Sequence, residues 1–308
     1  MKAMICTKYG SPDVLELREV PKPAPKDNEI LVKVRATSVT TGDCRVRGFN
    51  SPLSYWIPMR IFLGIRKPRQ PILGVELAGE VEEVGKAVTR FRKGDRIYAM
   101  TGMRFGGYAE YTCMAEDGLV AEKPANATFA EAAGVLFGGT TALHFFRKAN
   151  IRAGHKVLVY GASGAVGTSA VQLAKHFGAE VTGVCSTANV ELVKSLGADK
   201  IVDYTTEDFA DGTEHYDIVF DTVGKAAKSR ARKALAPNGI YVSVEGQGVA
   251  KERREDVLLL KELIETGKIK PVIDRLYPLE QIPEAHRYVE KGHKKGNVII
   301  TVSHEDSL

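Results

Sequence analysis

Between residues 156 and 244, short apolar segments alternate with segments of helical pattern. The segments 157–160, 181–184 and 218–220 are continuously apolar, which is typical of strands buried on both faces. Helical segments between them end at the glycines Gly178 and Gly197. This order predicts a parallel sheet with helices on both faces and a ligand crevice at the carboxyl ends of its strands.

The rest of the chain predicts a second, mostly β domain. Residues before 124 form short strand-like runs separated by Gly and Pro, for example 30–34, 79–84 and 108–112. Thr128 and Glu131 have the spacing of a capping box, and the helix that they begin should continue to Ala149 with an interruption near Gly138 and Gly139.

Two further helices, at 253–266 and after Pro283, and a last strand at 297–302 complete the chain. We place that last strand in the first domain. We therefore expect a mostly β domain of residues 1–123, completed by 270–308, and an α/β domain of residues 124–269.

Composition and charge exclude several classes of protein. The 308 residues carry a formal net charge of +5, and we identify no aromatic–basic patch, so a nucleic-acid partner is not favoured. The four cysteines are far apart without a CxxC pair, which argues against a disulfide framework and a cysteine-rich zinc site. The apolar loop 55–65 is too short to span a bilayer, and no secretory signal precedes the first strand. We expect a cytoplasmic protein without a membrane partner.

The most informative motif lies where the strand 157–160 passes into a helix. Glycines at such a turn let the backbone approach a pyrophosphate, and the helix N-terminus offers free amides and the positive end of its dipole. Ala162 departs from the strict glycine fingerprint, and a plain tight turn is the alternative reading. The strand–turn–helix context favours dinucleotide binding by Gly161, Ser163, Gly164, Ala165, Val166 and Gly167.

The end of the next strand favours NADPH over NADH. An NAD enzyme usually has an acidic residue there to hold the adenosine ribose, and this chain has none. Ser186 and Thr187 stand in its place and can bond a 2′-phosphate, although Ala188 and Asn189, rather than Arg or Lys, follow them. Helix capping is the other role open to Ser186 and Thr187.

These motifs together resemble the medium-chain dehydrogenase/reductase superfamily, in its zinc-independent quinone oxidoreductase-like branch. The resemblance covers nearly the whole chain and rests on the segments 74–81, 94–97, 107–111, 161–167, 196–199 and 220–224. It implies a Rossmann-type, doubly wound parallel sheet and a GroES-like, mostly β substrate domain.

The resemblance also implies that no zinc is bound. Zinc alcohol dehydrogenases of the family hold a catalytic metal with Cys, His and Cys, and the corresponding residues here are Thr40, Val75 and Phe137, none of which is a normal zinc ligand. Without a Lewis acid, reduction of a quinone or an α,β-unsaturated carbonyl by NADPH is the expected chemistry, since positioning is then the main task.

The resemblance nominates further site residues. Thr40 would donate a hydrogen bond to the acceptor oxygen, Asp43 would line the cleft or hold its own turn, and Tyr55 would close the pocket or merely cover the core. The implied cofactor contacts are Thr141, Tyr204, Val223 and Asn297. No catalytic role is assigned to a histidine.

One departure from the family concerns the residues after 240–244. Residues 245–250 run almost directly into the helix at Arg253, so one helix and the sixth strand of the sheet are missing. Relatives pair that strand with a partner subunit, so we expect a monomer or an altered dimer. The alternative to a reductase is a catalytically silent NADPH-binding sensor, or a nucleic-acid-binding protein, on the same fold.

Overall fold

The computed structural model describes residues 1–50 and 56–304. The chain divides into two compact units, one of Met1–Leu136 with Ile273–Leu308 and one of Phe137–Val272. They are called unit 1 and unit 2 below. The sequence places the domain boundaries at 123/124 and 269/270, and these boundaries stay a prediction.

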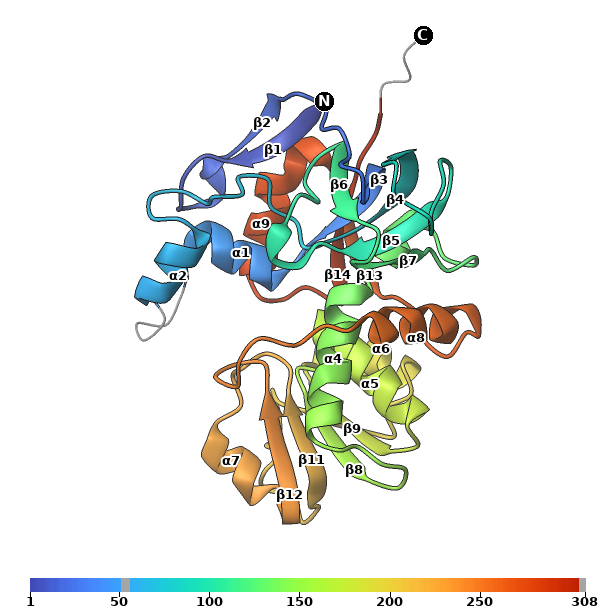
Figure 1. Cartoon of the computed structure of the whole chain (residues 1–308). Helices are drawn as coiled ribbons and strands as arrows, with labels where there is room; N and C mark the ends of the chain where they lie inside the picture. Colours follow the sequence, from blue (N-terminus) through green and yellow to red (C-terminus); the bar gives the residue numbers. More distant parts are fainter. Residues whose placement is uncertain (51–55, 305–308) are drawn as a thin grey trace. The chain divides into compact units, whose positions relative to one another are not determined.

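Unit 1 is built on a seven-stranded sheet of order β13-β14-β3-β4-β5-β7, with β6 paired to β3. The C-terminal strand β14 pairs antiparallel with β3 and parallel with β13, beside which it is labelled in Figure 1, so the terminal stretch belongs to unit 1. Strands β1 and β2 form a separate antiparallel pair. The strands of unit 1 are β1 (Lys2–Cys6), β2 (Leu15–Glu19), β3 (Glu29–Val39), β4 (Glu76–Val84), β5 (Arg96–Met100), β6 (Tyr111–Ala115), β7 (Leu119–Glu122), β13 (Ile273–Pro278) and β14 (Asn297–Thr301).

Among its described residues unit 1 contains four α-helices, and two details of the prediction were wrong. The expected loop 55–65 contains a helix, α2, and the expected strand 108–112 begins later, at Tyr111, because the Tyr108 amide bonds the Leu73 carbonyl instead of a ladder partner. The capping box of Thr128 and Glu131 at the start of α3 is confirmed. The helices are α1 (Thr41–Gly48), α2 (Trp56–Leu63), α3 (Phe129–Ala133) and α9 (Ile282–Glu290).

Unit 2 is the expected doubly wound α/β unit. Its five strands are all parallel, in the order β10-β9-β8-β11-β12. They are β8 (Lys156–Tyr160), β9 (Glu180–Cys185), β10 (Lys200–Asp203), β11 (Tyr216–Asp221) and β12 (Leu235–Ser243), and the helices are α4 (Leu136–Lys148), α5 (Ala165–His176), α6 (Val190–Ser195), α7 (Lys228–Lys233) and α8 (Arg254–Glu265). In the described part of unit 2, residues 244–253 form neither a helix nor a strand, so the sheet ends at β12.

The expected interruption of the helix near Gly138 and Gly139 was wrong. Helix α4 runs through both glycines, and the break comes earlier, at Gly134. A Cβ on Gly138 would lie 2.4 Å from the Ala165 carbonyl oxygen, and one on Gly139 would lie 2.7 Å from Leu260. The two glycines therefore allow close packing of α4 against α5 and α8 and do not end the helix.

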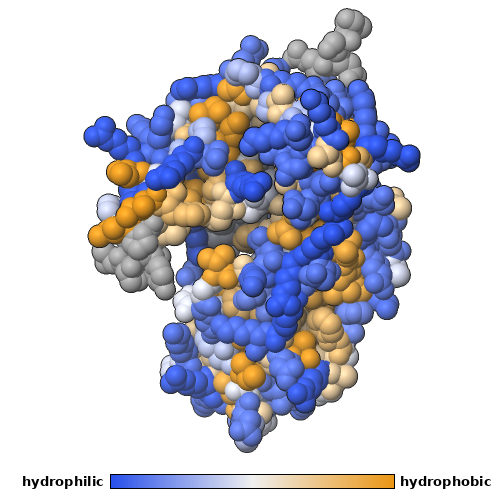
Figure 2. Space-filling view, viewed as in Figure 1, coloured by the Kyte–Doolittle hydropathy of each residue, from blue (hydrophilic) through white to orange (hydrophobic). Residues whose placement is uncertain are grey.

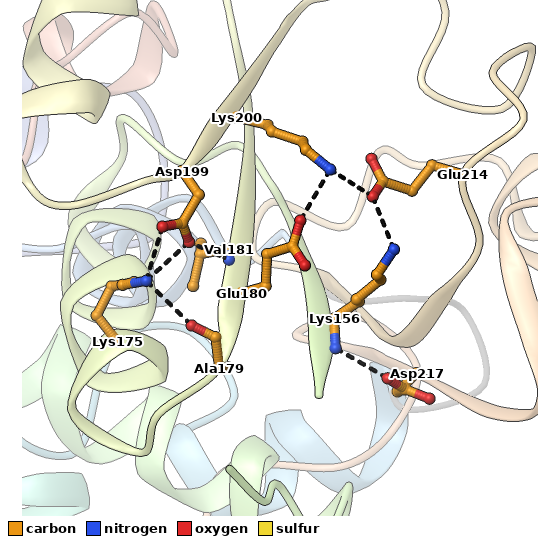
Figure 3. Close-up of polar contacts among 9 residues, drawn as sticks. All are labelled: Lys156, Lys175, Ala179, Glu180, Val181, Asp199, Lys200, Glu214 and Asp217. Carbon is orange, nitrogen blue, oxygen red and sulfur yellow. Dashed lines mark hydrogen bonds and ion pairs between the residues drawn. The ribbon is translucent and has the colours of Figure 1, made fainter. Parts of the chain in front are cut away.

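Ion pairs connect neighbouring strands of unit 2 at their amino ends (Figure 3). Lys200, which begins β10, bonds Glu180 at 2.8 Å and Glu214 at 2.6 Å. Asp199 accepts bonds from Lys175 and from the Val181 amide. The motif 196–199 thus has a structural role at the amino edge of the sheet, opposite the edge where a parallel sheet binds its ligand.

Candidate functional site

The turn between β8 and α5 has the geometry of a phosphate cradle. Gly161 has a φ of 81°, a value that favours glycine, and a Cβ there would lie 2.7 Å from the Val223 side chain. Gly164 is the N-cap of α5 and has no side chain to bond the first amides of the helix. Because those amides have no partner within a helix, they are available to an anion.

A second glycine sets the distance between α5 and the turn. A Cβ on Gly167 would lie 2.1 Å from the Gly161 carbonyl oxygen, so only glycine fits. The Thr222 hydroxyl bonds the carbonyl oxygens of Tyr160 and Gly161, which joins the end of β11 to this turn. The structure thus brings Gly161, Ser163, Gly164, Ala165, Val166, Gly167 and Val223 together at the carboxyl ends of β8 and β11.

Asp221 organises the neighbouring turn that carries Val223. Its fully buried carboxylate accepts bonds from the amides of Val223, Gly224 and Ala226, at 2.8 to 3.1 Å. This role of Asp221 was not specified from the sequence, although the motif 220–224 contains it.

The end of β9 places Ser186 and Thr187 beside the glycine turn. The side-chain amide of Asn189 donates through Nδ2 to the Ser163 and Ser186 hydroxyls, at 3.2 and 3.1 Å. The Thr187 hydroxyl donates to the carboxylate of Asp203 at 2.5 Å. Sequence reasoning missed Asp203, which the register of β10 and β9 sets opposite Cys185. The site therefore contains an acidic residue, supplied by the next strand.

Two further predicted contacts lie in unit 2. Tyr204 directly follows β10, is exposed, and its amide bonds the Cys185 carbonyl at the same edge of the sheet. Thr141 is buried in α4, one turn after Gly138, whose backbone approaches Ala165 at the start of α5. Both residues therefore lie in the same unit as the glycine turn, and their roles as cofactor contacts stay predictions.

In unit 1, Thr40 and Asp43 form the capping box of α1. The Thr40 hydroxyl donates to Asp43 at 2.6 Å, and the Thr40 and Gly74 amides donate to the two carboxylate oxygens. Burial raises the pKa of Asp43 to about 6, against the opposite effect of these hydrogen bonds. Donation by Thr40 to an acceptor oxygen stays a prediction, and it requires the hydroxyl to turn away from Asp43.

A buried polar cluster beside Asp43 joins Tyr108, His286 and Cys44. The Tyr108 hydroxyl lies 3.2 Å from His286 Nε2, and His286 Nδ1 lies 3.4 Å from the Cys44 sulfur. Burial, with a smaller contribution from Arg47, lowers the pKa of His286 to about 3, so the ring is neutral. The contacts with Tyr108 and Cys44 use both nitrogens of the ring.

The two remaining nominated residues have different outcomes. Tyr55 lies outside the described residues. Asn297 is buried at the start of β14 and belongs to unit 1, whereas the glycine turn belongs to unit 2. Its role as a cofactor contact stays a prediction.

The residues at the family's zinc positions offer no metal ligand. Thr40 and Val75 in unit 1 and Phe137 in unit 2 lack a thiolate, imidazole or carboxylate. Across residues 1–50 and 56–304, no group of three or more His, Cys, Asp or Glu side chains is arranged to hold a metal ion.

Comparison with known proteins identifies the family. The alcohol dehydrogenase GroES-like domain matches residues 26–125, and zinc-binding dehydrogenase models match 165–268 and 249–300. A 2-methylene-furan-3-one reductase of Solanum lycopersicum is 37% identical over 97% of this chain and 79% of its own length. The chain belongs to the medium-chain dehydrogenase/reductase superfamily. Its relatives include enone and quinone reductases, the branch of the superfamily that the sequence motifs resemble.

Other members of the superfamily agree with this assignment. An NADPH-dependent alkenal/one oxidoreductase of Arabidopsis thaliana is 34% identical, covering 97% of this chain and 79% of the relative. The solved structure of the quinone oxidoreductase from Coxiella burnetii matches with a TM-score of 0.87 and 28% identity, over 98% of this chain and 99% of that one. The chain is therefore an oxidoreductase of the medium-chain type that uses a nicotinamide cofactor. None of its helices in the described residues has the length and apolar character to cross a membrane.

Proposed function

We propose that this chain reduces quinones or α,β-unsaturated carbonyl compounds with NADPH. The observation that carries the proposal is the β8–α5 turn, in which Gly161, Gly164 and Gly167 leave room for a pyrophosphate beside the first amides of α5. The reductases named among its relatives support the substrate class.

The preference for NADPH is the finer part of the proposal. It is supported by the absence of an acid at the end of β9, where Ser186 and Thr187 stand, and by the NADPH-dependent relative. Asp203 opposes the preference for NADPH, because its carboxylate accepts the hydrogen bond of the Thr187 hydroxyl and would repel a 2′-phosphate. Binding of NADPH thus requires Thr187 to exchange this bond for one to the phosphate.

When bound, NADPH supplies a hydride, and the acceptor takes up a proton from water. For an enone, hydride addition at the β-carbon and protonation at the α-carbon give the saturated ketone and NADP⁺; for a quinone, the product is the hydroquinone. In this proposal Thr40 bonds the carbonyl oxygen of the acceptor. Asp43 positions Thr40, because both oxygens of its carboxylate are already bonded to protein donors.

The proposal is tested by following NADPH oxidation with three acceptors: a simple enone, a benzoquinone and a saturated ketone. We expect turnover of one or both of the first two, no turnover of the saturated ketone, and a saturated ketone or hydroquinone as product. Thr40→Val should lower kcat, while Thr41→Val, the adjacent exposed threonine, should not. Tight NADPH binding without turnover of any acceptor would favour the silent sensor instead.

We also propose that the protein is cytoplasmic and that it is a monomer or an altered dimer. Cys6, Cys44, Cys113 and Cys185 are all free thiols, which supports a reducing compartment. The end of the unit 2 sheet at β12 supports the altered assembly, because the strand that relatives would pair across subunits has no counterpart among the described residues. Light scattering that gives a stable dimer paired through the edge of this sheet would contradict that part.

A further inference from the structure

Helix α2 turns its charged residue inward. The Arg60 guanidinium lies over the rings of Phe49, Tyr9 and Trp56, at 3.8, 4.6 and 4.9 Å from their centroids. It also donates to the Ile65 carbonyl at 2.5 Å. Cation–π contacts of this kind hold α2 on unit 1 by its polar side chain. The orientation of α2 is therefore the reverse of that of an ordinary surface helix.

The other side of α2, with Ile65 just after the helix, presents large apolar side chains to water. Ile57, Ile61, Phe62 and Ile65 are 60% to 71% exposed, and Trp56, whose ring also contacts Arg60, is 43% exposed. Figure 2 shows hydrophobic side chains at the surface in the region of α2. Together they expose on the order of 500 Å² of apolar surface, which soluble monomers keep contiguous mainly at sites of interaction. We call these five residues the α2 face.

A hollow and a basic segment adjoin the α2 face. The hollow has a volume of about 620 Å³ and is lined by Ile57, Ile61, Phe62 and Arg69. Arg66, Lys67 and Arg69 follow the helix and are exposed. None of these three cations forms an ion pair with an acid in the part of the chain that the structure describes. Apolar surface and unpaired positive charge therefore meet at one place.

We propose that the α2 face and its basic segment bind the surface of an anionic lipid bilayer. An interfacial helix buries its apolar side among acyl chains while basic side chains contact anionic headgroups, and Trp56 suits the boundary between them. A second copy of the chain, docked through the same patch, would bring its three cations next to the three of the first copy, and like charges repel. A nucleic acid would pair with the cations but leave the α2 face in water.

This proposal differs from the expectation of no membrane partner drawn from the sequence. That expectation was argued from the lack of a segment long enough to span a bilayer, and it covered any membrane partner. Helix α2 has only eight residues, so it would lie in the interface and not cross it. The inference goes beyond the proposed reduction, and it is tested without cofactor or substrate.

The test is flotation of the full chain with two kinds of vesicle, phosphatidylcholine alone and an equimolar mixture of phosphatidylcholine and phosphatidylglycerol. We expect binding to the mixture, little binding to phosphatidylcholine alone, and release by high salt. The variant Arg66→Gln/Lys67→Gln/Arg69→Gln should bind on the order of a hundredfold more weakly, since each cation near the surface contributes about fivefold. The variant Ile57→Ser/Ile61→Ser/Phe62→Ser should lose binding at least as strongly.

The matched control removes the same charge elsewhere on unit 1. Lys8, Lys86 and Lys93 are exposed, and Lys8→Gln/Lys86→Gln/Lys93→Gln should bind nearly as the wild type does. Thermal unfolding followed by circular dichroism confirms that each variant is folded. The proposal is overturned if the wild type binds neither kind of vesicle, or if the two charge variants lose vesicle binding equally. It is also overturned if the chain forms a concentration-dependent dimer that only the apolar substitutions abolish.

Discussion

Two alanine substitutions in the β8–α5 turn separate the folding of unit 2 from its binding of the cofactor. Gly164 and Gly167 are three residues apart, yet their surroundings differ. A Cβ on Gly167 would lie 2.1 Å from the Gly161 carbonyl oxygen, whereas one on Gly164 would meet only that same oxygen at 3.6 Å, an ordinary contact. Gly167→Ala should therefore strain the fold, and Gly164→Ala should project a methyl group into the open space at the turn.

The expected magnitudes follow from these distances. For Gly167→Ala, α5 must move away from the turn by roughly 1 Å, and overpacking of this kind costs about 1–3 kcal/mol. The Tm should fall by about 3–10 °C. Gly164→Ala should change the Tm by much less. It should weaken NADPH binding about 10- to 100-fold, because a hydrogen bond to a charged group contributes about 1.5–3 kcal/mol.

The assays are thermal unfolding and titration calorimetry with NADPH, on the wild type and both variants. The reasoning is refuted if Gly164→Ala binds NADPH as tightly as the wild type, because no pyrophosphate then lies at the turn. An unchanged Tm for Gly167→Ala would contradict the steric part of the argument. A loss of binding in Gly164→Ala with an equally large loss of stability would leave no basis for separating the two roles.

Three other predictions concern specificity, acid stability and metal. Asp203→Asn should lower the ratio of KM for NADPH to KM for NADH in steady-state kinetics, while Asp211→Asn, an exposed control, should leave this ratio unchanged. The same ratio in the wild type and in Asp203→Asn would exclude Asp203 from selecting the cofactor. His286 is neutral in the fold because burial lowers its pKa to about 3, so the stability that it contributes is complete above pH 6.5 and is lost as the pH falls towards 3. In urea titrations at several pH values, His286→Gln should flatten this acid limb and the exposed His293→Gln should leave it unchanged. Dialysis against a chelator should leave NADPH oxidation unaffected, and a loss that zinc restores would contradict the metal-free proposal.

Local sequence signals predicted most elements of unit 2. Most strands there have their own apolar pattern, glycines follow α5, α6 and α8, and the Thr128–Glu131 capping box is an equally local signal. The interruption predicted at Gly138 and Gly139 was wrong because those glycines pack closely against Ala165 and Leu260, which are distant in sequence. A local pattern cannot distinguish a glycine that ends a helix from one that allows close packing.

Helix α2 and Asp203 show two other limits of the sequence. Pro58 suggested a loop, but it is the third residue of α2, where the backbone amide has no helical partner to lose. Asp203 was missed because the family pattern places the acid at the end of β9, whereas Asp203 ends the neighbouring strand β10. The carboxylate reaches Thr187 from sixteen residues away, through the pairing of β10 with β9.

The carboxylates of unit 1 already have protein donors, which supports the metal-free part of the proposal. Asp43 accepts bonds from Thr40 and the Gly74 amide, and Glu76 accepts one from the Ser38 hydroxyl. A cation would have to displace these donors and would still find no thiolate or imidazole at Thr40 or Val75. The residues left to polarise an acceptor are therefore hydroxyl donors. A hydroxyl stabilises a developing oxyanion less than zinc does, so the acceptor itself must be electrophilic, and this requirement is what favours a conjugated carbonyl or a quinone over a simple ketone.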